Sequence, residues 1–189
     1  DQVIDRIVTA NENGTTVRFP VNLAVEDNVG FELNSSYKFS KKLSFNANFN
    51  FFRAIRKGEF EGQKLDFDVF TWNSRGVVKM EVLPKVDFQA SFRYRAPQET
   101  TQGRRKSIYS LDLSLGKDVL KGKGTLVASV RDVFNSRKRR SITETSNLYS
   151  TSEFQWRARQ FLLTFSYRIN QKKKQGGGRN NGFDGGDDF

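Results

Sequence analysis

The chain has 189 residues and a formal net charge of +11, a length that fits one medium domain or one segment of a larger one. It contains no Cys and no His, which excludes disulfide scaffolds, thiolate zinc sites and catalytic triads built on His. No run of eight consecutive apolar residues occurs, so the sequence predicts neither a transmembrane helix nor a signal-peptide core. Any contact with a membrane is therefore expected to be made by strands.

The first half of the chain shows a strand period. A weak first strand is expected at 2–10, and apolar residues then alternate with polar ones from 29 to 39. After a short break at 40–42 the pattern restarts over 43–51, and a longer run covers 64–82. A tight turn at 83–85 leads into alternation over 86–95. These segments predict antiparallel hairpins.

The second half repeats this organisation. Strands are expected at 109–115, at 125–131 after a moderate turn at 118–123, and at 161–169. The breaks at 11–27, 96–106 and 135–154 are long, while the break at 58–63 is shorter. All three prolines are expected in breaks, because proline cannot donate a ladder hydrogen bond.

The pattern predicts an all-β, antiparallel fold of about eight strands over residues 1–170. Strands of a soluble sandwich have about five or six residues, whereas most of these are longer. Long strands joined by alternating short and long breaks are typical of transmembrane β-barrels. A soluble sandwich is a less favoured interpretation of the same alternation. Residues 171–189 form a basic, Gly-rich and Asp-rich tail that we expect to be flexible.

The two parities of the strands predict two surfaces. A barrel places apolar side chains toward lipid, polar side chains toward the lumen and aromatic rings at the interfaces. The candidate lumen-facing residues are Asn46, Asn48, Asn50, Arg75, Lys79, Gln89 and Arg93. The candidate aromatic-girdle residues are Phe39, Phe92, Tyr94, Tyr109 and Tyr167.

Several short motifs carry a family resemblance. They are FNFF at 49–52, RAPQET at 95–100, GKDVL at 116–120, SVRDVFN at 129–135, SEFQWRAR at 152–159 and FSYRIN at 165–170. In this order and spacing the chain resembles the C-terminal barrel part of a TonB-dependent receptor of the Bacteroidetes outer-membrane β-barrel type. The resemblance covers about residues 1–170.

The resemblance implies a function and a set of partners. Such receptors have a plug domain inside a barrel of about 22 strands and take up a scarce substrate with energy delivered through TonB, which contacts the plug. The chain shows no plug-like domain, TonB box or signal peptide, so the remaining strands and plug are expected from upstream sequence or another chain. Outer-membrane lipid, lipopolysaccharide and a surface lipoprotein are further implied partners. The short turns and the tail are expected in the periplasm.

The basic stretch Arg137, Lys138, Arg139 and Arg140 lies in a long break that is expected to be extracellular. Four adjacent cations there could meet anionic lipopolysaccharide or an anionic substrate. A plain solvated cluster is the more frequent interpretation of such a run.

Chemical motifs are few. The segment from Gly122 to Gly124 resembles only a piece of a phosphate loop, and Asp184, Asp187 and Asp188 do not have EF-hand spacing. Asp66 and Asp68 share a strand face and resemble a carboxylate pair, but no nucleophile accompanies them. We therefore expect no enzymatic activity, no metal site and no cofactor.

Two other functions remain open at this stage. Eight strands can close a small barrel, so the chain is also compatible with a self-contained outer-membrane protein of structural or adhesive type. The excess of 32 Lys and Arg over 21 Asp and Glu allows a soluble nucleic-acid-binding β protein. That function would need a basic stripe interleaved with aromatics, whereas the aromatics here share a face with aliphatic residues. No nucleic-acid partner is therefore expected.

Overall fold

The computed structural model describes residues 2–10, 15–60, 63–64, 66–145 and 147–169. Within these ranges the chain forms thirteen strands and one 3₁₀ turn, η1 (Leu120–Gly122). No helix in the described part of the chain is long and apolar enough to cross a membrane. The predicted flexibility of 171–189 and the three aspartates of that tail lie outside the described residues.

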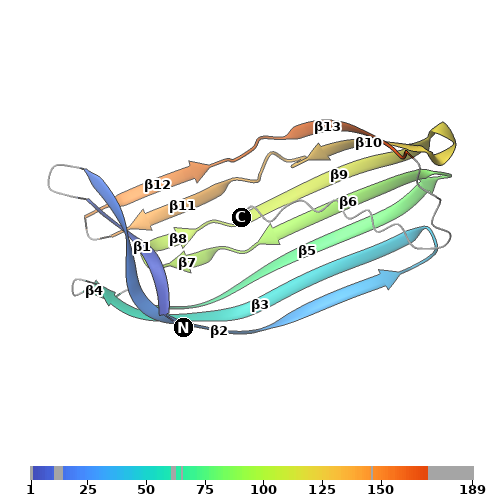
Figure 1. The fold of residues 1–189 in the computed structure, drawn as a ribbon. Helices are drawn as coiled ribbons and strands as arrows, with labels where there is room; N and C mark the ends of the chain where they lie inside the picture. The colour runs from blue at the N-terminus through green and yellow to red at the C-terminus, as the bar shows by residue number, and fades with distance from the viewer. Residues whose placement is uncertain (1, 11–14, 61–62, 65, 146, 170–189) are drawn as a thin grey trace.

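Eight strands follow one another in a single antiparallel sheet, here called the main sheet (Figure 1). Its order is β1-β2-β3-β5-β6-β9-β10-β13, and the short β4 (Gln63–Lys64) pairs with β3. The strands are β1 (Gln2–Ala10), β2 (Thr16–Lys38), β3 (Leu43–Phe60), β5 (Phe67–Leu83), β6 (Val86–Arg95), β9 (Ile108–Val119), β10 (Gly124–Arg131) and β13 (Gln160–Tyr167). The predicted all-β antiparallel class is confirmed, and each expected strand overlaps one of these eight. The expected run 64–82 begins too early, since β5 begins at Phe67, and the expected strands 29–39 and 161–169 extend one and two residues past the ends of β2 and β13.

Four more strands form a second sheet, here called the distal sheet. They are β7 (Gln98–Thr100), β8 (Gly103–Arg105), β11 (Arg139–Glu144) and β12 (Tyr149–Phe154), in the order β12-β11-β8-β7. The breaks expected at 96–106 and 135–154 therefore contain hairpins. Their residues are polar on both parities, so hydrophobic alternation does not reveal them.

The break expected at 11–27 is wrong for residues 16–27, which belong to β2. Pro20 lies inside this strand, opposite Arg6 of β1. Strand β3 pairs with β2 only from Ala24 onward. One edge of β2 is thus open at Pro20, and a proline is tolerated where no ladder partner needs its missing N–H.

The tight turns lie at one end of the main sheet and the distal hairpins at the other (Figure 1). In the first tight turn the Ser40 hydroxyl accepts hydrogen bonds from the backbone N–H groups of Lys42 and Leu43, both at 3.1 Å. Lys85 adopts a left-handed φ of 65° in the second turn. This asymmetry matches the short-turn and long-loop ends expected for an outer-membrane barrel.

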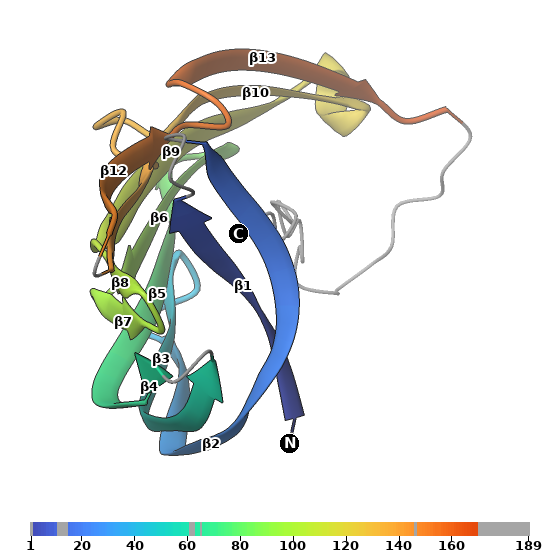
Figure 2. The ribbon, with the colours of Figure 1, turned by 90° about the vertical axis from the view of Figure 1, so that its left-hand side faces the viewer.

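The main sheet is strongly curved, and its two edges bend toward the same side (Figure 2). Strands β1 and β13 are its edges, and the described residues show no pairing between them. At the distal end the Gln102 side chain accepts a hydrogen bond from the Val8 N–H at 2.7 Å and donates one to the Val8 carbonyl at 2.9 Å. This contact ties β1 to the turn between β7 and β8.

Most apolar residues in the described ranges are not buried. Four hydrophobic residues are buried there, Ile7, Ala54, Ala96 and Ile142. Large apolar side chains are instead exposed along the main sheet, as at Phe31 and Leu33 in β2 and Phe161 in β13. A water-soluble sandwich would cover this surface. The packing therefore favours strands whose apolar side meets lipid.

Candidate functional site

One side of the main sheet, here called the apolar face, carries a continuous group of aromatic rings across four strands. Phe31 of β2 lies 5.7 Å from Phe51 of β3, measured between ring centroids. Phe49 lies 5.7 Å from Trp72 of β5, and Trp72 lies 4.5 Å from Tyr94 of β6. Rings at these separations attract one another beyond their simple burial. The group gives this face a large apolar surface suited to lipid.

The five girdle candidates lie toward the two ends of the strands. Phe39 follows β2 at the tight-turn end, where its ring meets Tyr37 edge-on at 4.7 Å, and Tyr167 ends β13 at the same end. Tyr94 and Tyr109 stand opposite each other at the far end of β6, two residues beyond Phe92. This placement resembles two interface rows.

The opposite side, here called the polar face, begins with a ladder of amide side chains on β2, β3 and β5. Asn48 donates to Glu32 at 2.8 Å and to Asn34 at 2.7 Å. Asn50 donates to Asn73 at 3.1 Å. Asn46 accepts a hydrogen bond from the Ser36 hydroxyl at 2.8 Å. The three asparagines singled out from the sequence thus form one hydrogen-bonded surface.

The other four lumen candidates continue this face. Arg75 of β5 stands directly between Asn48 of β3 and Arg93 of β6 in the strand register. Lys79 of β5 stands opposite Gln89 of β6. Cross-strand partners share a face of an antiparallel sheet. The structure therefore brings all seven candidates onto the polar face.

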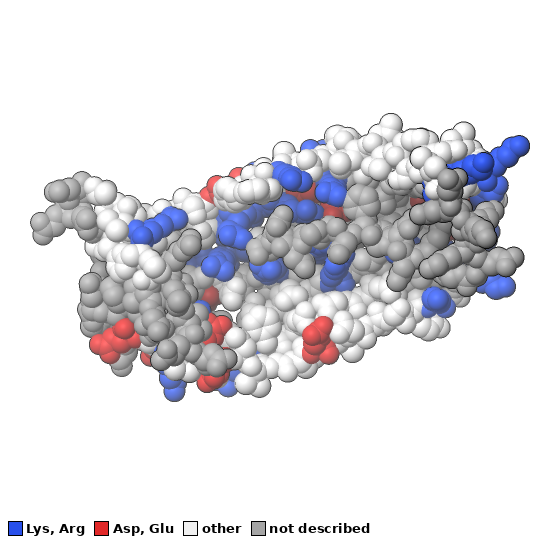
Figure 3. Space-filling model, in the orientation of Figure 1, with Lys and Arg blue, Asp and Glu red and all other residues white. Residues whose placement is uncertain are grey.

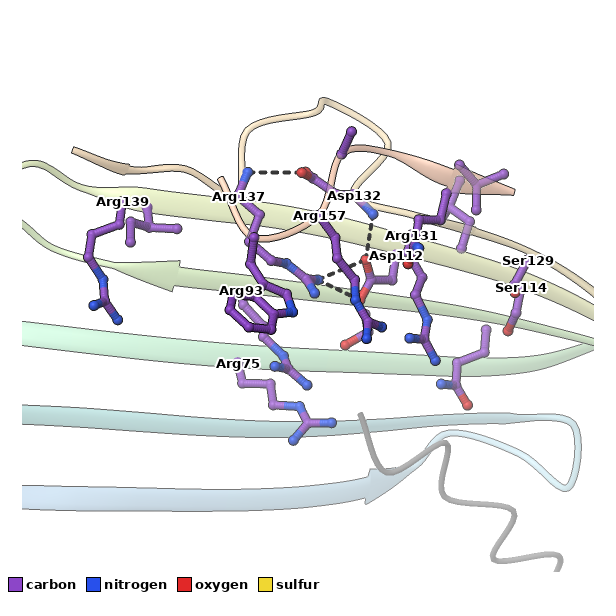
Figure 4. Close-up of a pocket in the computed structure, with 18 of the residues that line it drawn as sticks. Arg75, Arg93, Asp112, Ser114, Ser129, Arg131, Asp132, Arg137, Arg139 and Arg157 are labelled. Atoms are coloured by element: carbon purple, nitrogen blue, oxygen red, sulfur yellow. Dashed lines mark hydrogen bonds and ion pairs between the residues drawn. The ribbon is translucent and has the colours of Figure 1, made fainter. Parts of the chain in front are cut away.

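A cavity of about 610 Å³ lies on the polar face, over β5, β6, β9 and β10, and is closed on one side by the loop after β12. Figure 3 shows Lys and Arg side chains gathered in the hollowed middle of this side of the molecule. Six arginines and two aspartates line the cavity, which we call the arginine pocket: Arg75, Arg93, Arg131, Arg137, Arg139, Arg157, Asp112 and Asp132 (Figure 4). The lining has an excess of four positive charges.

The two aspartates hold the wall of the pocket in place. Asp132 is 2% exposed and has a left-handed φ of 52°. Its carboxylate accepts hydrogen bonds from the backbone N–H groups of Ser136 and Arg137, both at 2.9 Å. Asp112 accepts from the backbone N–H of Asp132 at 2.7 Å and pairs with the Arg137 guanidinium at 3.0 Å. The short segment between β10 and β11 is therefore built around these two carboxylates.

The four adjacent cations predicted as one extracellular patch are divided between two surroundings. Arg137 and Arg139 line the arginine pocket. Lys138 and Arg140 instead pair with the Glu153 carboxylate at 2.8 and 2.7 Å. Hydrogen bonds from Lys138 and then Arg140 lower the pKa of Glu153 from its ordinary value. Arg137 and Lys138 precede β11, and within β11 the alternation of side chains directs Arg139 and Arg140 to opposite faces.

Asp66 and Asp68 are engaged separately. Asp66 accepts a hydrogen bond from the Gly58 backbone N–H at 2.8 Å, and Asp68 forms an ion pair with Arg53 at 2.5 Å. Each carboxylate therefore has its own structural partner. Gly122, with a φ of 84°, lies in the turn before β10, where a turn was expected.

Sequence reasoning missed four members of the pocket: Asp112, Arg131, Asp132 and Arg157. Asp112 and Arg131 lie on polar parities of strands that the alternation did identify, so their face was available as a signal. Asp132 and Arg157 follow strands, and their inward placement depends on turns that periodicity does not specify.

Residues 1–167 match a family model described as the outer membrane protein beta-barrel family. Neither the comparison with curated proteins nor that with solved structures gave a match. The family model spans the whole main sheet and the distal sheet. The exposed apolar face, the hydrogen-bonded polar face and the family match agree, and this chain belongs to the outer membrane protein β-barrel family.

Proposed function

We propose that this chain is the C-terminal barrel part of a TonB-dependent receptor and takes part in energised uptake of a scarce substrate across the outer membrane. The observation that carries the proposal is a ligand-sized cavity on the polar face of a sheet whose other face is apolar. Cavities of a few hundred Å³ hold small ligands. The order of the motifs that resemble such receptors supplies the link to TonB.

The orientation follows from the two ends of the main sheet. Barrels of the outer membrane have short periplasmic turns and longer extracellular loops. The tight turns before β3, β6 and β10 would then face the periplasm, and the distal sheet would face the outside. Because β13 runs toward the tight-turn end, the tail at 171–189 would begin in the periplasm.

The edges of the main sheet call for further strands. Backbone groups left unpaired in lipid are strongly unfavourable, and β1 and β13 are edges of the described sheet. We propose that further strands and a plug are supplied by upstream sequence or another chain. TonB would act through the plug, lipid and lipopolysaccharide would contact the apolar face, and a surface lipoprotein would meet the distal sheet. We propose no catalytic step for any of these residues.

The test is made on the native protein in outer-membrane fractions, detected with an antibody to the sequence 176–189. We expect a denatured species several times heavier than 21.7 kDa that crosslinks to TonB in energised cells. Substitution of its TonB-contacting segment should abolish the crosslink without removing the protein from the membrane. A species that never contacts TonB would contradict the proposal.

The same experiment separates the alternatives. A folded, heat-modifiable species near 21.7 kDa would favour either a self-closed eight-stranded barrel, which needs β1 to pair with β13, or a receptor split over two chains. Copurification of a second barrel chain would separate these two outcomes. Recovery only from the soluble fraction, bound to nucleic acid, would favour the third function. The exposed apolar face argues against that last result.

A further inference from the structure

We propose that the arginine pocket binds a compact polyanion, a sugar or cyclitol that carries several phosphate or sulfate groups. This inference names the substrate class of the proposed receptor. That the bound ligand is a transport substrate rests on the proposed function, whereas its binding depends only on residues of the polar face.

The strand register places Arg75 and Arg93 directly opposite each other on β5 and β6. Opposed residues of an antiparallel pair have Cβ atoms about 5 Å apart, so both guanidinium groups can reach one ligand on the polar face. An anion held between them would receive charge-assisted hydrogen bonds from both side chains.

Both carboxylates of the pocket already accept hydrogen bonds within the protein. Asp132 accepts them from backbone N–H groups, and Asp112 from Arg137 and the Asp132 N–H. Arg75, Arg139 and Arg157 form no ion pair with a carboxylate in the described part of the chain. Figure 4 shows the side chains of Arg75, Arg93 and Arg157 directed into the same space. Guanidinium groups match phosphate and sulfate oxygens with paired N–H donors.

The arginine pocket also has an aromatic rim. Phe154 and Trp156 line the pocket together with Arg157, and the two ring centroids are 6.1 Å apart. Trp156 is 72% exposed, although it is a large apolar side chain. An open aromatic face beside cations suits a ligand with a ring and charged substituents. This combination favours a substituted ring over a simple inorganic ion.

A second, smaller cavity of about 90 Å³ lies next to the arginine pocket. It is lined by Arg95, Arg105, Lys106 and Arg139, and it shares Arg139 and Ile108 with the larger cavity. Its described lining contains no acidic residue. The two cavities form a basic track from the distal sheet to the middle of the main sheet. Such a track raises the local concentration of an anionic ligand and guides its entry.

The experiment measures binding to the complete, detergent-solubilised outer-membrane protein by calorimetry. The probe is myo-inositol hexakisphosphate, and uncharged myo-inositol is its matched neutral ligand. We expect binding of the hexakisphosphate alone, with an affinity that falls as salt is raised. The double variant Arg75→Gln/Arg93→Gln should weaken the affinity by about tenfold or more, because it removes two charged donors.

The control is the double variant Lys138→Gln/Arg140→Gln, which removes the same charge from the same protein outside the pocket. Its affinity should stay within about twofold of the parent, since exposed cations paired with Glu153 contribute little. Equal weakening by both double variants would overturn the proposal and indicate non-specific attraction. Absence of hexakisphosphate binding would also overturn it.

A stability measurement guards against a variant that fails to fold. Hexakisphosphate should raise the unfolding temperature of the parent protein, because a ligand that binds only the folded state stabilises it. The same ligand should raise the unfolding temperature of Arg75→Gln/Arg93→Gln much less, whatever the temperature at which that variant unfolds without ligand. An equal rise in both proteins would overturn the proposal. Neither measurement involves TonB, so loss of the TonB crosslink with retained binding would refute the uptake function alone.

Discussion

The main sheet and the distal sheet follow the same antiparallel hydrogen bonding but place different side chains on their surfaces. The main sheet exposes aromatic and aliphatic residues on one whole face, including Phe31, Leu115 and Phe161. In the distal sheet every residue of β12 is exposed, and most are polar. Its strands are joined by ion pairs to Glu153 and by a 2.7 Å hydrogen bond between Ser141 and Ser152.

This difference indicates that the two sheets have different solvents. An exposed apolar face is stable only against lipid or another apolar partner. Exposed Ser, Thr and paired charges are instead typical of a surface in water. The ten residues of β6 extend about 30 Å at the usual rise of a strand, close to the thickness of a bilayer core. The change of solvent would then occur near Tyr94 and Tyr109.

The largest expected effect is a charge on the apolar face. Phe161 of β13 is 77% exposed, and its register row runs through Val130 and Leu113 to Ala90 in the middle of β6. Phe161→Arg should lower the free energy of unfolding in lipid by about 2 kcal/mol or more, because an arginine on the lipid face of a barrel is most costly near the bilayer midplane. Urea unfolding in bilayers measures this change.

The matched control is Ser150→Arg on the exposed strand β12. It adds the same side chain to the distal sheet and should change the free energy of unfolding by less than about 0.5 kcal/mol. Equal effects at the two sites would mean that both sheets face water. The main sheet and the distal sheet would then not differ in their solvent.

A second expected effect concerns close backbone packing in the main sheet. A Cβ added at Gly30 of β2 would overlap the Phe51 carbonyl oxygen and approach the Phe52 Cβ to 2.5 Å. Gly30→Ala should therefore force β2 away from β3 and destabilise the protein by about 1–3 kcal/mol. Gly76→Ala is the control, since its Cβ would meet Phe45 at an ordinary 3.7 Å. Similar unfolding midpoints for both variants would contradict the close approach.

The contrast between the sheets also explains which strands are predictable from the sequence and which are not. A face that meets lipid must be apolar at every second residue, so the period of β2, β3, β6 and β9 is readable without a structure. A sheet in water has no such constraint, and the strands around Ile142 and Ser152 look like loops in the sequence. Pro20 misled the prediction for β2, because a proline is also compatible with a strand whose edge is open there.

The residues of the polar face were predictable to the same extent as the strands that carry them. Parity alone placed Asn48, Arg75 and Arg93 together, because each belongs to a strand with a clear apolar face. Parity did not predict that Arg157 would join them, since it reaches the pocket from the loop after β12. Nor did parity predict that Arg137 lines the pocket while Lys138 pairs with Glu153, because the break at 135–154 was expected to be a loop. Turn conformation and tertiary packing supply that part of the site.

A third expected effect lies at the junction of the two sheets. Asp132→Ala would remove the acceptor for two backbone N–H groups and place alanine at a left-handed φ. The segment 132–137 should open locally, at a cost of about 1–2 kcal/mol. Protease cleavage after Arg137 should become faster while the main sheet stays folded. Asp132→Asn is the control, because asparagine tolerates that conformation and retains one acceptor oxygen.

If both Asp132 variants are cleaved at the parent rate, the segment is held by other contacts and the carboxylates do not shape the pocket wall. If Asp132→Ala instead unfolds the whole protein, the two sheets form one cooperative unit. A local effect would keep the distal sheet as a separate, less stable region.

The smallest expected effect is the pH dependence of the distal sheet. Lys138 and Arg140 lower the pKa of Glu153 in the folded protein. The stabilisation is therefore complete above the pKa that Glu153 has when unfolded, and it is lost as pH falls through the lowered folded value. Because all three side chains are solvent-accessible, the effect should be small and screened by salt.

Glu153→Gln should remove this acid-side change in amide exchange of β11 and β12, whereas Glu144→Gln, which removes a carboxylate from the same hairpin, should retain it. A titration unchanged by Glu153→Gln would show that the ion pairs at the end of the distal sheet do not hold its outer hairpin.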